Sequence, residues 1–423
     1  MDLRAVHGSE QRLEAYIEGL ARVMGHADRA DPLRDYCIGL LLPVERKSVE
    51  PMAAVTAPSR TSAQHQSLLH FVGQAGWSDE RVLAKVCEMV LPEMVRDGPI
   101  EAWVIDDTGF AKKGRHSVGV ARQYCGELGK QDNCQVAVSL SLASAHASLP
   151  VAYRLYLPKE WSEDQERRRK AGVPEEVRFK TKPQIALDHI HAACQAGLPR
   201  GTVLMDSGYG HDAKLRAAIT ALDLTYVAGV LSNALIWKPG KEPAADGARP
   251  PKRGRRCQPD VISVQELALG LPAQSWHTIA WRDGSAEPLT SRFARLRVRV
   301  ADRRQVSPPE WLLIEWPEDA SEPTKYWLST LPHDIAFDRL VDRAKLRWRI
   351  ERDYHDLKQE IGLGHFEGRG WRGFHHHASL CIAAYGFLIC ERATIPPSAP
   401  RKAALFAPPR LPPGYKPRGA SAV

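Results

Sequence analysis

Three acidic residues, Asp106, Asp206 and Glu351, stand where carboxylates could do chemistry together. Asp106 follows the apolar run 103–105, Asp206 follows the apolar run 203–205, and Glu351 falls within a predicted helix. Carboxylate oxygens suit Mg²⁺, and two such ions held roughly 3.5 to 4 Å apart would activate a water or a 3′-hydroxyl and stabilise the leaving oxygen in phosphoryl transfer. The pattern favours metal-dependent chemistry on a phosphodiester, with Mn²⁺ expected to substitute for Mg²⁺.

Each acid also has an ordinary structural interpretation. An aspartate after a short strand commonly caps a turn or a helix. Glu351 could instead form an i,i+4 surface ion pair with Arg347. These structural roles explain each acid singly but explain the set of three less well. The structural roles stay open as alternatives, and a shared catalytic site is favoured.

The helix around Glu351 has two faces. At 3.6 residues per turn, Arg347, Glu351 and Lys358 fall within about 40° of one another. An apolar stripe lies about 100° away and is expected to face the core. It consists of Leu346, Ile350, Leu357 and Ile361. Glu351 is thus predicted on the shoulder of the buried face, where it can point into a cleft with cations beside it that can hold phosphates.

Periodicity predicts the elements that would position these residues. A helical pattern runs over 10–95, with a Pro and Ser break at 58–62. A β-β-β-α-β-α-β order follows, because β-rich runs alternate with amphipathic ones. The expected strands are 102–106, 134–143, 149–156, 202–206 and 224–230, and the expected helices are 182–197 and 213–222.

The later part of the chain changes in character. Residues 239–260 are rich in Pro, Gly and Arg and predict an exposed loop. Four β-rich runs follow, at 276–281, 293–300, 311–316 and 325–330, and then one long helix over about 337–363. We therefore expect five segments: a helical, DNA-end-binding domain at 1–95, a first part of a catalytic core at 96–232, a β-rich insertion at 233–335, the last core helices at 336–392 and a Pro-rich tail at 393–423.

Composition indicates which binding partners and which cellular location to expect. The formal charge is +8, which favours polyanionic partners but is also compatible with an ordinary solvated surface. The eight cysteines form no C-x-x-C pair, so neither a zinc ribbon nor a disulfide framework is indicated. No signal core is seen, and no apolar stretch reaches about 18 residues, the length that would indicate a membrane-spanning helix. A cytoplasmic, nucleoid-associated protein without a membrane partner is expected.

Three motifs carry a family resemblance: Val-Ile-Asp-Asp-Thr-Gly at 104–109, Val-Leu-Met-Asp-Ser-Gly-Tyr-Gly at 203–210, and Arg-Trp-Arg-Ile-Glu at 347–351 with Leu-Lys at 357–358. With them, the sequence resembles the DD(E) transposases of bacterial insertion sequences. The third motif is similar to the Tyr-Arg-Glu-Lys signature of insertion-sequence group four, and 362–369 is similar to its branch seven hundred and one. The resemblance implies a ribonuclease-H-like α/β fold: a mixed sheet flanked by helices, interrupted by a β-rich insertion, after an N-terminal helical domain.

The resemblance also implies roles for single residues. Asp106, Asp206 and Glu351 would be the catalytic residues and the ligands of two Mg²⁺ ions, and Arg347 and Lys358 would contact phosphate. Asp106 is chosen over its neighbour because the family places one spacer and then Ser or Thr after the first aspartate. The sequence departs from the signature at Ala344, where a tyrosine is expected.

Several other residues admit two interpretations. Lys112, Lys113 and Arg115 could hold a DNA backbone beside the first aspartate, or could be a solvated charged loop. Trp327 in the insertion could stack on a flipped base, although a core tryptophan is the commoner case. The adjacent histidines 375–377 point in three directions on a helix and so are not expected to bind a metal.

The expected function is transposition: binding terminal inverted repeats of double-stranded DNA, as a homodimer in the synaptic complex, cleaving, and transferring 3′ ends to target DNA. One alternative is a ribonuclease-H-like nuclease without strand transfer. The other is a catalytically silent DNA-binding regulator derived from a transposase. Imperfect inverted repeats flanking the gene would favour the first.

Overall fold

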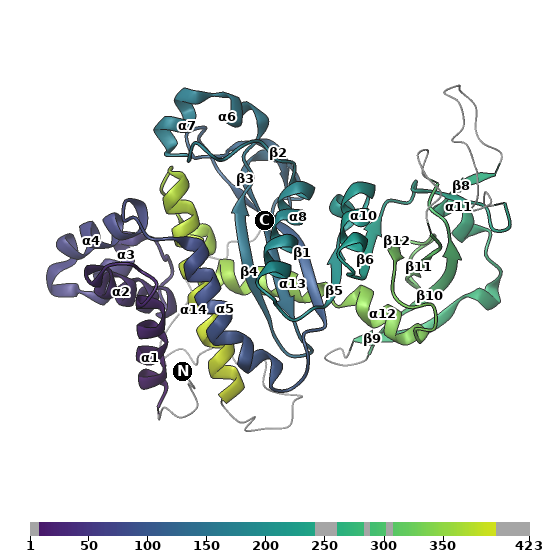
Figure 1. The fold of residues 1–423 in the computed structure, drawn as a ribbon, viewed down its shortest axis with the longest axis horizontal. Coiled ribbons are helices and arrows are strands. Elements are labelled where there is room, and N and C mark those ends of the chain that lie inside the picture. Colours follow the sequence, from purple (N-terminus) through teal and green to yellow (C-terminus); the bar gives the residue numbers. More distant parts are fainter. Residues whose placement is uncertain (1–7, 242–259, 283–287, 302–307, 395–423) are drawn as a thin grey trace, which may run out of the picture.

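Five helices form the N-terminal part of the computed structural model in Figure 1, which describes residues 8–241, 260–282, 288–301 and 308–394. The predicted helical character of 10–95 is confirmed, and the predicted break coincides with a 3₁₀ turn, Pro58–Arg60, between the third and fourth helices. The helices are α1 (Ser9–Ala21), α2 (Ala30–Leu41), α3 (Val49–Thr56), α4 (Thr61–Gly73) and α5 (Asp79–Val95).

A large mixed sheet forms the centre of the described chain. Its ten strands run in the order β2-β3-β1-β5-β6-β12-β11-β10-β9, with β4 paired to β3. β1 is antiparallel to β3 but parallel to β5, which in turn is parallel to β6. The first six strands are β1 (Ala102–Ala111), β2 (Ala121–Cys125), β3 (Lys130–Ala143), β4 (Ser148–Leu155), β5 (Thr202–Met205) and β6 (Tyr226–Val230). This mixed sheet, flanked by helices, confirms the predicted α/β fold.

Two details of this half differ from the sequence prediction. β2 is absent from that prediction, because its sequence is short and polar. β1 does not end at Asp106: it continues to Ala111 because β3, which reaches back to Lys130, pairs with its whole length. Asp106 therefore lies within a strand, not after one.

The helices between the strands begin and end where local signals place them. At the start of α8, Thr181 and Gln184 form a capping box, and Gly197, just beyond its end, has a φ of 64°. α8 packs against β3. The helices of this half are α6 (Lys159–Glu163), α7 (Gln165–Ala171), α8 (Lys182–Gln195), α9 (Ser207–Gly210) and α10 (Ala213–Ala221).

The four β-rich runs of the expected insertion are strands, but they extend the central sheet. β12 pairs with β6 through Tyr326↔Val230 to Ser329↔Val227, and so covers an edge whose backbone groups would otherwise lack partners. The elements are β7 (Leu235–Trp237), β8 (Val261–Ser263), α11 (Val264–Leu269), β9 (His277–Arg282), β10 (Leu289–Val298), β11 (Glu310–Trp316) and β12 (Lys325–Ser329). Most of the predicted basic loop and nearly all of the Pro-rich tail lie outside the described residues.

The prediction of a single long helix over 337–363 is wrong: the region holds α12 (Phe337–Lys345), α13 (Trp348–Gln359) and a 3₁₀ turn, Leu363–His365. No proline or glycine causes the break between α12 and α13. The two helices separate because they pack on different surfaces: α12 contacts β9, β5 and β6, whereas α13 contacts β1 and β4. Arg347 lies at the break, immediately before α13.

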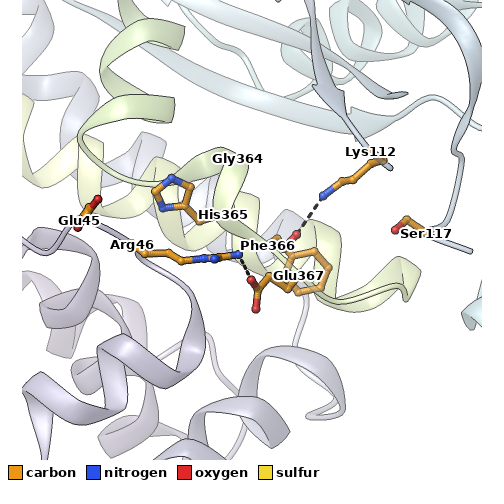
Figure 2. A pocket seen from close by; sticks show the side chains of 8 residues that line it. All are labelled: Glu45, Arg46, Lys112, Ser117, Gly364, His365, Phe366 and Glu367. Carbon is orange, nitrogen blue, oxygen red and sulfur yellow. Dashed lines mark hydrogen bonds and ion pairs between the residues drawn. The ribbon is translucent and has the colours of Figure 1, made fainter. Parts of the chain in front are cut away.

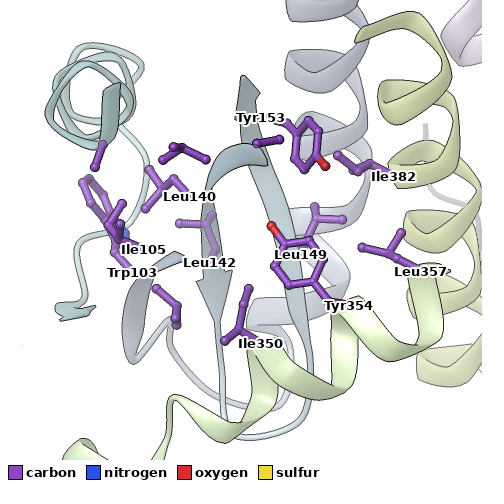
Figure 3. Close-up of a cluster of buried hydrophobic side chains, with 14 of the residues drawn as sticks. Trp103, Ile105, Leu140, Leu142, Leu149, Tyr153, Ile350, Tyr354, Leu357 and Ile382 are labelled. Carbon is purple, nitrogen blue, oxygen red and sulfur yellow. The ribbon is translucent and has the colours of Figure 1, made fainter. Parts of the chain in front are cut away.

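The last described helix, α14 (Trp371–Thr394), is buried along most of its length. It packs against α2, α4 and α5 on one side and β4 on the other, as Figure 1 shows. Figure 3 shows part of the hydrophobic core, to which α13 contributes Ile350 and Leu357 and α14 contributes Ile382, whereas Leu140 lies beside Ile105 of the paired strand β1. Within the ranges that the structure covers, no helix is both long enough and apolar enough to span a membrane.

Candidate active site

Asp106 and Asp206 are brought together by the central sheet. β1 and β5 are parallel neighbours, paired through Trp103↔Val203 and Val104↔Leu204. Each aspartate lies two residues beyond the second of these pairs. Because parallel strands present corresponding positions side by side, the two carboxylates reach the same side of the sheet.

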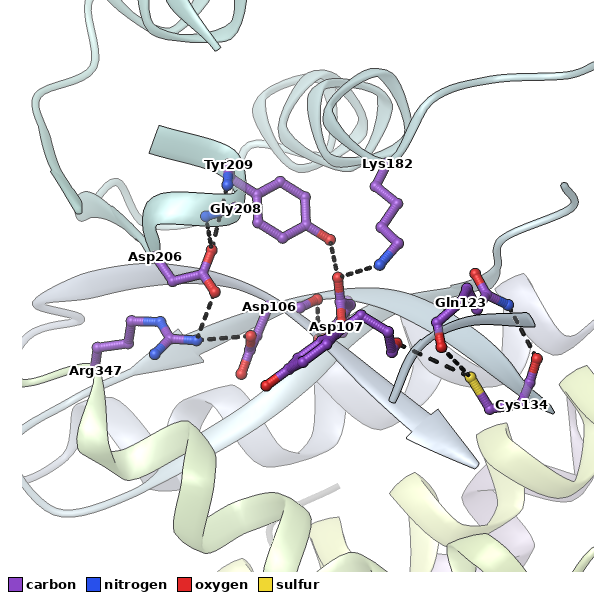
Figure 4. A network of polar contacts seen from close by, with 11 residues as sticks. Asp106, Asp107, Gln123, Cys134, Lys182, Asp206, Gly208, Tyr209 and Arg347 are labelled. Atoms are coloured by element: carbon purple, nitrogen blue, oxygen red, sulfur yellow. Dashed lines mark hydrogen bonds and ion pairs between the residues drawn. The ribbon is translucent and has the colours of Figure 1, made fainter. Parts of the chain in front are cut away.

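Asp206 also serves as a helix cap. It precedes α9, and its Oδ1 accepts backbone N–H bonds from Gly208 at 2.9 Å and Tyr209 at 3.2 Å. The capping interpretation of this aspartate is therefore correct, but it uses one oxygen only. Oδ2 lies 3.8 Å from the guanidinium of Arg347 (Figure 4).

Two glycines let α9 sit against β6. A Cβ on Gly210 would lie 2.0 Å from the carbonyl oxygen of Gly229, and a Cβ on Gly229 would lie 2.9 Å from the backbone nitrogen of Ser207. Side chains at either position would push the turn that carries Asp206 away from the sheet. Close packing against β6 therefore explains why the second glycine of the Asp-Ser-Gly-Tyr-Gly motif, Gly210, has no side chain.

Glu351 reaches the same place from α13, in the first turn of that helix. Its side chain is 71% exposed, and its Oε1 lies 3.8 Å from Arg347. The surface ion pair expected as the ordinary alternative is present. The same guanidinium also donates to Asp106 Oδ1 at 2.7 Å, so Arg347 contacts all three predicted catalytic carboxylates.

The neighbouring aspartates of β1 have different partners, because successive side chains on a strand point to opposite faces. Asp106 meets Arg347. Asp107 instead accepts from Lys182 Nζ at 2.9 Å and from the Tyr209 hydroxyl at 3.2 Å (Figure 4). Asp106, and not Asp107, is therefore the β1 aspartate that shares Arg347 with Asp206 and Glu351. Lys182 and Tyr209 hold Asp107 beside the site, and sequence reasoning did not predict these contacts because no spacing rule connects the two residues to Asp107.

The electrostatics of the cluster reflect its burial and its charge. Burial raises the pKa of Asp106 to about 6, with Arg347 opposing the shift and Asp206 and Asp107 adding to it. Burial lowers the pKa of Arg347, but Asp106 and Asp206 outweigh it, and the net shift is upward. The guanidinium is therefore a fixed positive charge among three carboxylates.

The donor set suits Mg²⁺, since all three predicted ligands offer carboxylate oxygens. Within the described ranges, however, no group of three or more His, Cys, Asp or Glu side chains is close enough to hold an ion. The three carboxylates are instead gathered around the Arg347 guanidinium. The guanidinium therefore occupies the place between the three carboxylates where a cation would bind. The type of ligand atom, carboxylate oxygen, fits Mg²⁺.

The predicted phosphate-contacting residues are not all in this cluster. Lys358 Nζ donates to the Gly109 carbonyl at 2.7 Å and to Glu127 at 2.9 Å, which directs it away from the three carboxylates. Lys113 and Arg115 are exposed. Lys112 Nζ donates to the Phe366 carbonyl at 3.1 Å, and burial lowers the pKa of Lys112.

Lys112 also lines an open cavity of about 770 Å³ between the N-terminal helices and the core (Figure 2). Arg46 and Glu367, which form an ion pair, line it too. The remaining lining residues are Glu45, Ser117, Gly364, His365 and Phe366. Opposite charges are mixed in this cavity, so it is not a simple anion site.

The remaining residues that the sequence singled out, Trp327, Ala344 and the histidines 375–377, are buried in the structure. Trp327 is 9% exposed on β12, as a core tryptophan would be. Ala344, where the signature has tyrosine, is buried on α12. The three adjacent histidines are buried and bond to carbonyls in different directions: His375 to Trp371, His376 to Val72 and Trp77, and His377 to Gly362.

Comparisons with known proteins indicate the family of the chain. A family model described as "DDE superfamily endonuclease" matches residues 19–288, which include Asp106 and Asp206 but not Glu351. The chain is 30% identical over 200 residues to a "Probable transposase for insertion sequence element IS701" of Microchaete diplosiphon, covering 47% of this chain and 48% of that protein. The chain thus spans about half the length of this curated relative. From the family match, the chain belongs to the DDE superfamily endonucleases.

Proposed function

We propose that this protein is a DNA transposase that cleaves at the terminal inverted repeats of its element and transfers the 3′ ends to target DNA. The observation that carries the proposal is the meeting of Asp106 from β1, Asp206 from the end of β5 and Glu351 from α13 at one guanidinium. The three acids come from separate elements and share one cation, and a common metal site would require the same convergence, because like charges gather only around a positive charge.

Asp106, Asp206 and Glu351 would hold two Mg²⁺ ions, for which Mn²⁺ would substitute. When bound, these ions would activate the attacking water or 3′-hydroxyl and stabilise the leaving oxygen. The protein's own residues prepare the site. The backbone N–H groups of Gly208 and Tyr209 fix the Asp206 carboxylate. Glu351, being exposed, lies where a duplex can approach.

The DNA would be held outside this cluster. Lys112, Lys113, Arg115 and Lys358 are proposed to contact its backbone, and the helices of 1–95 are proposed to select the terminal repeats, since phosphate contacts position DNA without reading its sequence. A homodimer would bring two ends together. These assignments extend the family membership and the similarity to a probable transposase.

The test uses isosteric variants of the full chain with DNA carrying the element's ends. Asp206→Asn keeps a capping oxygen and Glu351→Gln changes an exposed side chain, so both should fold and bind DNA as the wild type does. Both should lose cleavage and joining. Asp107→Asn is the matched control, because Asp107 faces Lys182, and it should retain most activity.

Three results would contradict the proposal. Cleavage by Glu351→Gln at the wild-type rate would remove Glu351 from the site. Wild-type cleavage without joined products would indicate a nuclease without strand transfer. Specific DNA binding by a wild-type protein that cleaves nothing with Mg²⁺ or Mn²⁺ would indicate a regulator.

A further inference from the structure

We infer that Arg347 is a built-in counter-cation that competes with the metal ions for the three carboxylates. The inference rests on the proposed function in taking these carboxylates as metal ligands. Arg347 Nη2 lies 2.7 Å from Asp106 Oδ1 and 3.8 Å from Asp206 Oδ2, and Nη1 lies 3.8 Å from Glu351 Oε1. One guanidinium thereby balances charge contributed by a strand, a turn and a helix.

The position of Arg347 explains why it can play this part. It lies at the break between α12 and α13, where its side chain is 22% exposed. A residue at a helix boundary can change side-chain rotamer without disturbing a packed helix face. The ion pairs with the carboxylates are the contacts of its guanidinium.

Its hydrogen bonding is also incomplete. Nε of Arg347 is buried and has no acceptor among the described residues. A buried donor without an acceptor costs free energy, which leaves this group able to gain from an added acceptor. A phosphate group can accept from a guanidinium through two oxygens at once.

The metal and the guanidinium would compete for the same carboxylate oxygens. A Mg²⁺ ion bound by these carboxylates would lie within a few ångströms of the guanidinium, and the two cations would repel each other in a partly buried site. Metal entry would therefore displace Arg347 from the carboxylates. The released guanidinium would then be free for a phosphate of the DNA.

The experiment measures metal binding without DNA, by titrating full-length protein with Mn²⁺ and following free Mn²⁺ by electron paramagnetic resonance. Arg347→Met should bind Mn²⁺ at least several-fold more tightly than the wild type. Arg343→Met is the matched control: Arg343 has similar exposure, at 19%, but pairs with Glu101 at 3.0 Å. It removes the same charge and should change the affinity much less.

A second measurement needs no variant. Phenylglyoxal labelling of wild-type protein, read by mass spectrometry, should modify Arg347 faster when Mg²⁺ is present. Unchanged or weaker Mn²⁺ binding by Arg347→Met, an equal gain in Arg343→Met, or slower labelling with Mg²⁺ would each overturn the inference. A wild-type protein that binds metal but cleaves no DNA would instead count against the proposed function.

Discussion

Burial decides the ionisation of single residues well beyond the candidate site. His189 on α8 is 8% exposed and lies against the Val138 carbonyl at 3.3 Å. Burial lowers its pKa to about 4. Since the charged form is disfavoured in the folded protein, the unfolded chain takes up a proton at a higher pH than the folded chain does.

We therefore predict that His189 makes the protein less stable in acid. Its contribution is fully present above the unfolded pKa near 6.5 and is lost as the pH falls toward 4. In urea unfolding at about pH 7, above this window, and at about pH 4.5, near its lower end, His189→Gln should lose less stability on acidification than the wild type. The exposed His70→Gln should behave as the wild type does. An identical pH dependence in His189→Gln would contradict the assignment.

At the scale of elements, α12 is tied to the added strands by a buried ion pair. Lys345 Nζ pairs with the Glu315 carboxylate on β11, with side chains 9% and 4% exposed. The same ammonium lies 3.9 Å from the centre of the Trp281 ring. Because α12 leads directly to Arg347, this pair helps set where the candidate site's last element begins.

Lys345→Met should destabilise the protein by about 3 to 5 kcal/mol, because it leaves the Glu315 carboxylate buried without its cation. The double variant Lys345→Met, Glu315→Leu should recover most of that loss. Chemical unfolding of the single and double variants measures both. A double variant as unstable as the sum of its single variants would show that the pair is not coupled.

At the scale of the whole molecule, the positive charge surplus bears on DNA binding. The formal charge is +8, and Lys113 and Arg115 are exposed beyond the end of β1. Each cation that contacts a phosphate releases counterions from the duplex, so binding should weaken steeply with salt. The proposed contacts can be counted from that slope.

Lys113→Ala and Arg115→Ala should each lower the slope of log affinity against log salt by about 1, with little change in sequence preference. Lys325→Ala, an exposed charge on the added strands, serves as the control and should leave the slope unchanged. Fluorescence anisotropy over a series of salt concentrations provides the measurement. Unchanged slopes in both variants would remove these residues from the proposed DNA surface.

Local sequence determined most of the elements and the candidate residues. Apolar periodicity predicted the N-terminal helices and most strands, because an element that buries one face repeats apolar residues at its own structural period. The motifs also singled out Asp106, Asp206, Glu351 and Arg347. The strand β2 was not predicted, because its five residues are mostly polar and its identity as a strand comes from pairing with β3.

Only the tertiary structure decided how these parts meet. The break before Arg347 has no proline or glycine signal and arises because α12 and α13 pack on different surfaces. Likewise, the added strands join the central sheet through β6, a long-range pairing that no local pattern specifies. The contact of one guanidinium with three carboxylates depends on both, because it joins residues far apart in the chain through the packing of whole elements.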